Sequence, residues 1–322
     1  MHYRTLGRTG LSVSEIGYGA WGIGKTMWIG ADDRESLIAL QTAIENGLNF
    51  VDTALVYGDG HSERLIGRVL REHPNKIHVA TKIPPKNNRW PARKGTPMRD
   101  AFPKDHIIAC TEKSLRNLGL ECIDLQQFHV WTDEWSAQDE WWEAVTLLKK
   151  DGKIRFVGIS TNDHQPHSVI NAAKSGRIDS IQVIYNIFDQ SADDDLFPLC
   201  LKKNIGILAR VPFDEGSLAG QISPDTTFPE KDWRNRYFRG DRKQQVWERV
   251  QEIKKEMKDE AEDVAEFALR YILSNPAVSS VIPGMRTSFN VERNCAVSDG
   301  RVLKEETIER LKKHRWARNF YS

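Results

Sequence analysis

A carboxylate and a phenol stand close together in the stretch from Asn49 to Gly67. Phe50 and Val51 are apolar and strand-prone, and Asp52 follows where such a strand would end. Tyr57 falls in the Gly-rich turn before the next helix. A strand, a turn and a helix in this order place both side chains on one rim. A phenol is a weak acid, so it serves in catalysis only if neighbouring groups lower its pKa.

Two further groups follow strand-like segments of their own. Lys82 ends the segment 77–82, and His129 ends the segment 123–129. We therefore expect an aspartate, a lysine and a histidine at the carboxyl ends of successive strands, with the tyrosine in the first of the three loops.

These four residue types suit the transfer of a hydride to a carbonyl, which builds negative charge on the carbonyl oxygen. Tyr57 can donate a hydrogen bond and then a proton, and Lys82 as an ammonium would favour the tyrosinate and lower the Tyr57 pKa. Asp52 would hold Lys82, and His129 would donate a second hydrogen bond or relay the proton. Each residue alone has an ordinary structural explanation, but all four in this order favour catalysis.

The same residues carry a family resemblance. Asp52, Tyr57, Lys82 and His129 match the catalytic tetrad of the aldo-keto reductases, and Asp52-Thr53-Ala54-x-x-Tyr57-Gly58 matches their best-known motif. The chain resembles this family over residues 3–294. The resemblance implies an NADP(H)-dependent oxidoreductase that acts on an aldehyde, a ketone or the corresponding alcohol or sugar.

Composition fits one domain over residues 1–322, a (β/α)8 TIM barrel with long loops at its C-terminal face. The net charge of +1, from 46 basic and 45 acidic residues, gives no electrostatic case for nucleic acid or a membrane surface. No apolar run suits a membrane span, and the N-terminus lacks a signal-peptide core. The 4 scattered cysteines indicate a reducing cytoplasm, without a disulfide frame or a metal site.

Alternation of strand and helix patterns organises the chain. Residues 2–13 read as a β-hairpin, which in the family plugs the amino-terminal end of the barrel. We predict eight barrel strands at 16–19, 50–52, 77–82, 123–129, 155–158, 180–185, 206–211 and 278–282. We predict helices at 32–46, 63–72, 105–118, 139–150, 168–175, 195–203, 242–258, 261–274 and 305–313. Residues 83–103 and 213–241 read as long irregular loops.

Gly17-x-Gly19-x-x-Gly22 fits the dinucleotide fingerprint literally. The fingerprint requires its third glycine to open a helix, whereas the next helix pattern starts only near Asp32. We interpret the match as accidental. The glycines instead let the loop that holds Trp21 approach the nicotinamide end of the cofactor.

The resemblance also assigns residues that contact the nicotinamide. Ser160 and Asn162 follow the fifth strand and resemble the family's carboxamide contacts, and Gln182 on the sixth strand resembles the third such contact. The alternative is that Ser160 and Asn162 cap the next helix and that Gln182 is a buried hydrogen-bonding residue. We favour the cofactor, because all three side chains point to the same rim.

After the seventh strand, residues 211–218 resemble the family's pyrophosphate loop. The cofactor contacts expected there are Pro212, Phe213, Gly216 and Ser217. Arg210 departs from the family, because many relatives place an aromatic residue there to stack on the nicotinamide. A guanidinium can stack through its flat face, but its positive charge is unfavourable beside an oxidised, cationic ring.

After the eighth strand, residues 282–294 resemble the site for the adenosine 2′-phosphate. The expected contacts are Gly284, Arg286, Asn290 and Asn294. Backbone N–H groups at a helix start, together with Arg286, suit a phosphate dianion. This favours NADPH/NADP+, with NADH possible. The alternative is a solvated Arg286 and an ordinary helix cap at Ser288.

The barrel mouth is expected to be aromatic. Trp21, Trp28, Trp90 and Trp131 lie in segments that should surround it, and they would form a pocket for a carbonyl, stack on a sugar or staple loops. We expect a small-molecule carbonyl or sugar substrate, and a monomer or small homo-oligomer.

Two alternative functions stay open. One is a cofactor-binding regulatory subunit resembling the potassium-channel β subunits, against which the lack of a long amino-terminal extension counts. The other is a sugar dehydrogenase that acts mainly in the oxidative direction.

Overall fold

Eight parallel strands form the centre of the molecule. The computed structural model describes residues 1–25, 27–73 and 77–316. The strands are β3 (Tyr18–Gly19), β4 (Phe50–Asp52), β5 (His78–Ile83), β6 (Ile123–Phe128), β7 (Ile154–Ser160), β8 (Ser180–Ile184), β9 (Gly206–Arg210) and β10 (Val278–Val281). Neighbours in sequence are neighbours in the sheet. Parallel bridges from Ile16 to Val281 and from Gly19 to Gly284 join the first strand to the last. The predicted (β/α)8 barrel is confirmed.

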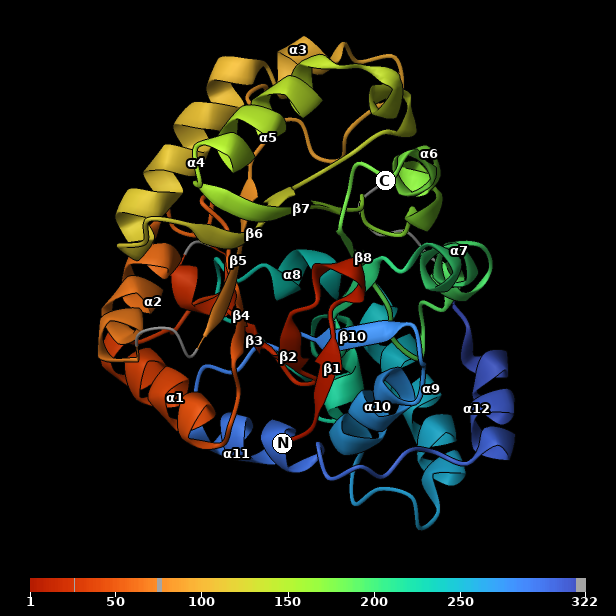
Figure 1. Cartoon of the computed structure of the whole chain (residues 1–322). Helices are drawn as coiled ribbons and strands as arrows, with labels where there is room; N and C mark the ends of the chain where they lie inside the picture. Colours follow the sequence, from red (N-terminus) through yellow and green to blue (C-terminus); the bar gives the residue numbers. More distant parts are fainter. Residues whose placement is uncertain (26, 74–76, 317–322) are drawn as a thin grey trace.

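Helices surround this sheet (Figure 1). Those that follow barrel strands are α1 (Asp33–Glu45), α2 (His61–Glu72), α4 (Lys104–Leu118), α5 (Glu140–Lys150), α6 (Ile170–Ser175), α7 (Leu196–Lys203), α10 (Val264–Leu273) and α11 (Ser288–Ala296). Helix α9 (Arg242–Met257) packs against α10 and against α12 (Glu305–Leu311). The helix pattern near Asp32 is confirmed, because the Asp32 carboxylate caps α1 by accepting from the N–H of Glu35 at 2.9 Å.

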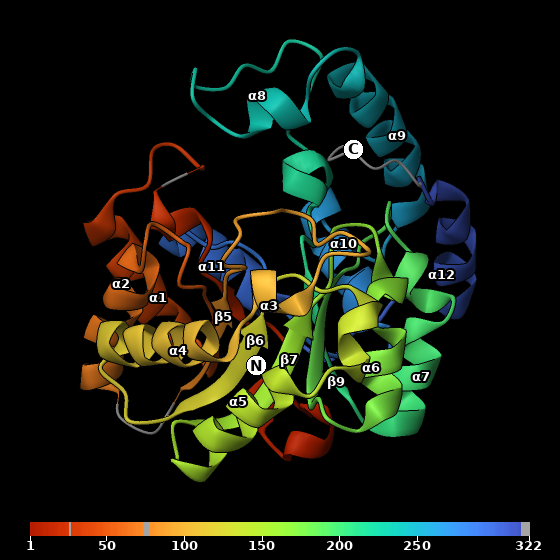
Figure 2. The ribbon, with the colours of Figure 1, turned by 90° about the horizontal axis from the view of Figure 1, so that it is seen from above.

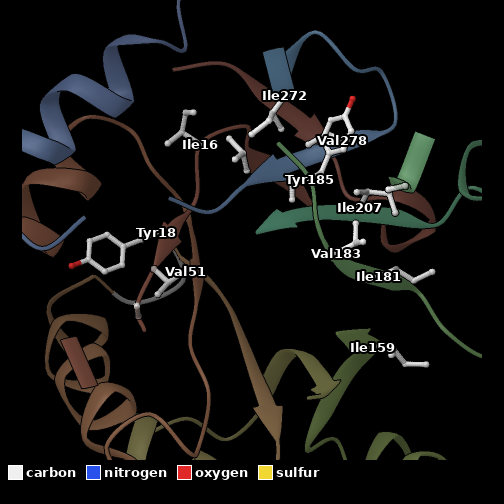
Figure 3. Close-up of a cluster of buried hydrophobic side chains, with 14 of the residues drawn as sticks. Ile16, Tyr18, Val51, Ile159, Ile181, Val183, Tyr185, Ile207, Ile272 and Val278 are labelled. Atoms are coloured by element: carbon white, nitrogen blue, oxygen red, sulfur yellow. The ribbon is translucent and has the colours of Figure 1, made fainter. Parts of the chain in front are cut away.

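Alternation along the strands separates two apolar layers. One set of buried side chains, including Val51, Ile181, Val183 and Ile207, belongs to the large cluster that the surrounding helices cover (Figure 3). The residues between them face inward. Gln182 lies between Ile181 and Val183 and is buried in the barrel. This alternation is what brings polar strand residues together inside the barrel.

The N-terminal hairpin is also confirmed. Strand β1 (Tyr3–Thr5) pairs antiparallel with β2 (Ser12–Ser14). Leu6 and Val13 are fully buried in a second cluster with inward-facing barrel residues such as Phe50 and Leu125. Burying these side chains against the barrel interior anchors the hairpin at that end. Figure 2 shows it below the strands, opposite α8.

Two short helices lie in segments predicted to be irregular. They are α3 (Met98–Ala101) after β5 and α8 (Arg234–Tyr237) after β9. Each has a single turn, which is too short for a periodic signal in the sequence. The segment with α8 rises above the strands (Figure 2) and contacts the first loop, where the N–H of Trp233 donates to the carbonyl of Met27 at 3.0 Å.

Within the described residues, no helix has the length and apolarity needed to cross a bilayer. The four cysteines are free thiols.

Candidate active site

Three strand ends converge at the end of the barrel opposite the hairpin. Lys82 on β5 donates from Nζ to Asp52 Oδ2 at 2.5 Å, to the carbonyl of Thr53 at 2.8 Å and to the Tyr57 hydroxyl at 3.4 Å. Lys82 is 0% exposed and Asp52 is 3% exposed. The ammonium is therefore fixed between a carboxylate and the phenol, as the sequence predicted.

The second oxygen of Asp52 is held by two amides. Gln182 donates from Nε2 to Asp52 Oδ1 at 2.7 Å, and Gln127 donates to the same oxygen at 3.1 Å. Both glutamines are buried. The sequence analysis missed Gln127, although it precedes His129 by two residues and so shares its face of the strand. Donors on both oxygens fix the orientation of the Asp52 carboxylate.

Burial decides the direction of the pKa shift for Tyr57 and His129, but not for Lys82. It raises the pKa of Tyr57 above that of an ordinary phenol, although the Lys82 ammonium lowers it. For Lys82, burial is the largest single effect and lowers the pKa, but Asp52 and Tyr57 together raise it by more, so the net pKa is raised. Burial, helped by Lys82 and Arg210, holds the pKa of His129 well below its usual range. At neutral pH the site therefore holds a protonated phenol, an ammonium and a neutral imidazole.

Aromatic rings line one side of this group. His129 lies edge-on to Tyr57 at 5.7 Å and to Trp90 at 4.7 Å between ring centroids. Trp21 lies 6.5 Å from Tyr57 and 5.9 Å from Trp28. Trp90 is 44% exposed, so its ring is open to a ligand. These three tryptophans are at the mouth, as expected.

Trp131 is buried and does not line a pocket at the mouth, so of the roles expected for it only the packing of loops fits. It is 0% exposed and packs against Phe128, Trp135 and Trp141. The indole N–H donates to Ser136 Oγ at 3.2 Å. An apolar ring that directly follows a strand is buried when the next segment folds back over it, and the short helical turn 133–137 does so here.

Two of the residues assigned to the nicotinamide, Asn162 and Gln182, already have hydrogen-bond partners. Asn162 is buried and exchanges two hydrogen bonds with the backbone of Ala92, both at 3.0 Å. It thus fastens the long loop after β5 to the loop after β7, and it does not cap α6. Ser160 is 2% exposed at the end of β7. Gln182 has the Asp52 contact described above.

Arg210, the last residue of β9, has a partner that the sequence did not indicate. Its Nη2 donates to Asp163 Oδ1 at 2.6 Å and to the carbonyl of Thr161 at 3.1 Å. Asp163 follows Asn162 in the loop after β7. A pairing between a strand end and a loop depends on the conformation of the loop, and it leaves no local pattern in the sequence.

The segment after β9 fits an anion-binding role. Ser217 Oγ is buried and has no hydrogen-bond partner among the described residues. A side chain added at Gly216 or at Gly284 would meet no atom within 4 Å, so both backbones face open space. Pro212 is buried and Phe213 is half-buried beside them. An unpartnered hydroxyl and two open backbone surfaces suit a pyrophosphate.

Helix α11 begins in the segment predicted to receive the 2′-phosphate, and its cap differs from the one considered in the sequence analysis. Its cap is Thr287, whose hydroxyl accepts from the N–H of Asn290 at 3.3 Å, and not Ser288. Arg286 is half-buried, donates to the carbonyl of Ile29 at 3.3 Å and lies 5.6 Å from the Trp28 ring. Asn290 is exposed and Asn294 is buried.

Comparison with known proteins identifies the family. The model of the "Aldo/keto reductase family" matches residues 15–315. The chain belongs to the aldo/keto reductase family. Members of this family are oxidoreductases that use nicotinamide cofactors.

Individual aldo/keto reductases and related proteins match nearly the whole chain. The chain is 30% identical to the aldo-keto reductase YhdN of Bacillus subtilis, covering 91% of this chain and 87% of that protein. It is 27% identical to a probable voltage-gated potassium channel subunit beta of Arabidopsis thaliana, covering 93% and 92%. The structure of a glycerol dehydrogenase from Gluconobacter oxydans superposes with a TM-score of 0.80 at 30% identity, covering 97% and 94%.

The aldo/keto reductase fold here also contains a buried acid that the sequence analysis missed. Glu215 lies in the segment after β9, is 6% exposed and has a left-handed backbone with φ of 57°. Burial, reinforced by Asp214 and Asp163, raises its pKa to about 8. Asp214 is held by the Tyr237 hydroxyl at 2.6 Å and by Arg242 at 3.0 Å.

Glu215→Gln should stabilise the cofactor-free protein at alkaline pH. An unfolded glutamate titrates near pH 4.3, at about its reference value, so the folded state binds this proton more tightly than the unfolded state does. The contribution of Glu215 to stability is therefore present below about pH 4 and is lost as pH rises through about 8. We expect the variant to melt higher than wild type at about pH 9 and similarly at about pH 5. Glu121→Gln, an exposed site, should show no such difference, and equal behaviour of the two variants would contradict the prediction.

Proposed function

We propose that this protein transfers a hydride between NADP(H) and an aldehyde or ketone, or the corresponding alcohol or sugar, with Tyr57 as the general acid and base. One observation carries the proposal: the Tyr57 hydroxyl lies 3.4 Å from a buried ammonium that is itself paired with Asp52 at 2.5 Å. A protonated phenol next to a fixed positive charge is what a developing alkoxide requires.

The protein side chains perform the proton chemistry. When bound, the nicotinamide supplies or accepts the hydride. Tyr57, kept protonated by burial, donates its proton to the carbonyl oxygen, and Lys82 stabilises the tyrosinate that remains. Neutral His129 donates a second hydrogen bond to that oxygen. In the oxidative direction, Tyr57 first loses its proton to water, Lys82 stabilises the resulting tyrosinate, and the tyrosinate accepts the alcohol proton.

The residues around the tetrad fit the cofactor. Ser160, Asn162 and Gln182 would hold the carboxamide, with Trp21 and Arg210 beside the ring. Pro212, Phe213, Gly216 and Ser217 would receive the pyrophosphate. Gly284, Arg286, Asn290 and Asn294 would receive the adenosine 2′-phosphate.

Arg286→Ala tests the coenzyme preference. Losing a charge-assisted hydrogen bond of about 1.5–3 kcal/mol should weaken NADPH binding by roughly 10- to 100-fold. NADH has no 2′-phosphate, so its affinity should change little. The measurement is titration of tryptophan fluorescence with each coenzyme. Arg293→Ala is the matched control, because Arg293 lies on the same helix and pairs with Asp263. Equal losses for NADPH and NADH in the Arg286 variant would show that this arginine does not contact the phosphate.

A second candidate function is a regulatory subunit that binds the cofactor as a redox sensor. The match to a potassium channel subunit beta favours it. A pull-down of a membrane partner, set beside a turnover assay with carbonyl compounds, separates the two.

The similarity to a glycerol dehydrogenase favours oxidation of a polyol or sugar as the physiological direction. Initial rates measured in both directions decide between reduction and oxidation.

A further inference from the structure

Arg210 and Asp163 form an ion pair at the rim of the barrel, next to the tetrad. The distance from Nη2 to Oδ1 is 2.6 Å, and the side chains are 17% and 32% exposed. The contact of the same nitrogen with the Thr161 carbonyl at 3.1 Å fixes the guanidinium against the loop after β7. The pair is thus partly shielded from water, so its charges are felt by neighbouring groups.

The guanidinium lies at the rim from which a nicotinamide would approach the Tyr57 hydroxyl. Hydride transfer requires the donor carbon within about 3–3.5 Å of the carbonyl carbon, and the carbonyl oxygen must reach the Tyr57 hydroxyl. A bound ring would therefore lie beside Tyr57. Arg210 is the last residue of β9 and so lies at the same rim of the barrel as Tyr57 and His129, and its positive charge lowers the pKa of both.

A charge in this position distinguishes the two forms of the cofactor. The nicotinamide ring is cationic when oxidised and neutral when reduced. An uncompensated guanidinium beside it would repel the oxidised ring and leave the reduced ring nearly unaffected. A carboxylate 2.6 Å from the guanidinium offsets this repulsion.

We propose that the Arg210–Asp163 pair sets the relative affinity of the site for oxidised and reduced cofactor, with Asp163 keeping the site able to bind the cationic form. The proposal rests on the proposed function, since it concerns the same cofactor site. Asp163 acts through Arg210 and is a positioning residue. By linkage, a tenfold change in the affinity ratio shifts the potential of the bound two-electron couple by about 30 mV. The pair therefore influences the direction in which the enzyme works.

The other charged groups near the Arg210–Asp163 pair already have partners of their own. Lys82 is paired with Asp52, and Asp214 is held by Tyr237 and Arg242. Glu215 also faces Arg210 and Asp163. Titrations at about pH 6.5, below the pKa of about 8 for Glu215, keep that group mostly neutral, so the response reports the pair.

The test is the ratio of dissociation constants, Kd for NADP+ over Kd for NADPH, measured by tryptophan fluorescence. Asp163→Asn preserves size and removes the carboxylate charge. It should raise the ratio roughly tenfold, mainly by weakening NADP+ binding. Arg210→Met leaves the carboxylate without the guanidinium and should lower the ratio. The double variant should return towards the wild-type ratio, because both charges are gone.

Asp139→Asn is the matched control, since it removes a carboxylate from an exposed ion pair with Arg177 and should leave the ratio unchanged. Unchanged ratios in both Asp163→Asn and Arg210→Met, with both cofactor forms still bound, would overturn the proposal and leave the proposed function intact. Failure of wild-type protein to bind either form would instead contradict the proposed function itself. If Asp163→Asn does not fold, Arg210→Met alone tests the proposal: a lower ratio than wild type supports it, and an unchanged ratio overturns it.

Discussion

Tyr57→Phe is expected to lower kcat for carbonyl reduction by about 10²–10⁴-fold, because a positioned general acid contributes about that much. The substitution removes one oxygen and keeps the ring that packs against His129 and Trp21. The affinity for NADPH should therefore stay near that of wild type. Steady-state rates and a binding titration on the same preparation measure both effects.

Tyr3→Phe is the control for this prediction. Tyr3 lies on the hairpin at the opposite end of the barrel, where its hydroxyl donates to the carbonyl of Gly47 at 2.7 Å. Its loss should not affect turnover. Wild-type activity in the Tyr57 variant would show that Tyr57 is not the general acid, whatever the activity of the Tyr3 variant.

Asp52→Asn is expected to cost about 3–5 kcal/mol of unfolding free energy, the usual result of leaving one partner of a buried pair uncompensated. Lys82 is 0% exposed and Asp52 accepts its shortest hydrogen bond, so water cannot replace the lost charge. Turnover should also fall, because an uncompensated Lys82 loses its fixed charge next to Tyr57. Urea unfolding of wild type and variant measures the stability change.

The double variant Asp52→Asn with Lys82→Met checks the explanation. Removing both charges should destabilise less than removing the carboxylate alone, since no buried ammonium is left unpaired. If the two losses simply add, the stability effect comes from packing and not from the unpaired charge.

The tetrad and the barrel could be predicted because both depend on local, repeated signals. Asp52 and Lys82 end apolar runs, and parallel strands place their carboxyl ends on one rim. A glycine turn between two short strand patterns predicted the hairpin. The capping residue Asp32 predicted the start of α1. Each of these signals spans only a few residues.

The missed features are contacts between distant segments. Gln127 could have been found from its two-residue spacing to His129. Asp163 and Glu215 could not, because both lie in loops whose conformation, and hence whose neighbours from distant segments, the sequence pattern does not determine. The net direction of the Tyr57 pKa was also not predictable, since it depends on burial outweighing the visible effect of Lys82.

The most direct test of the central claim follows the hydride itself. Purified protein is incubated with NADPH carrying deuterium on both positions of the nicotinamide C4 and with either glyceraldehyde or 4-nitrobenzaldehyde, and the products are analysed by mass spectrometry. The account predicts that wild type forms an alcohol with one deuterium on the former carbonyl carbon, and that Tyr57→Phe forms much less of this alcohol. An alcohol without deuterium, or equal amounts of deuterated alcohol from wild type and Tyr57→Phe, would contradict the account.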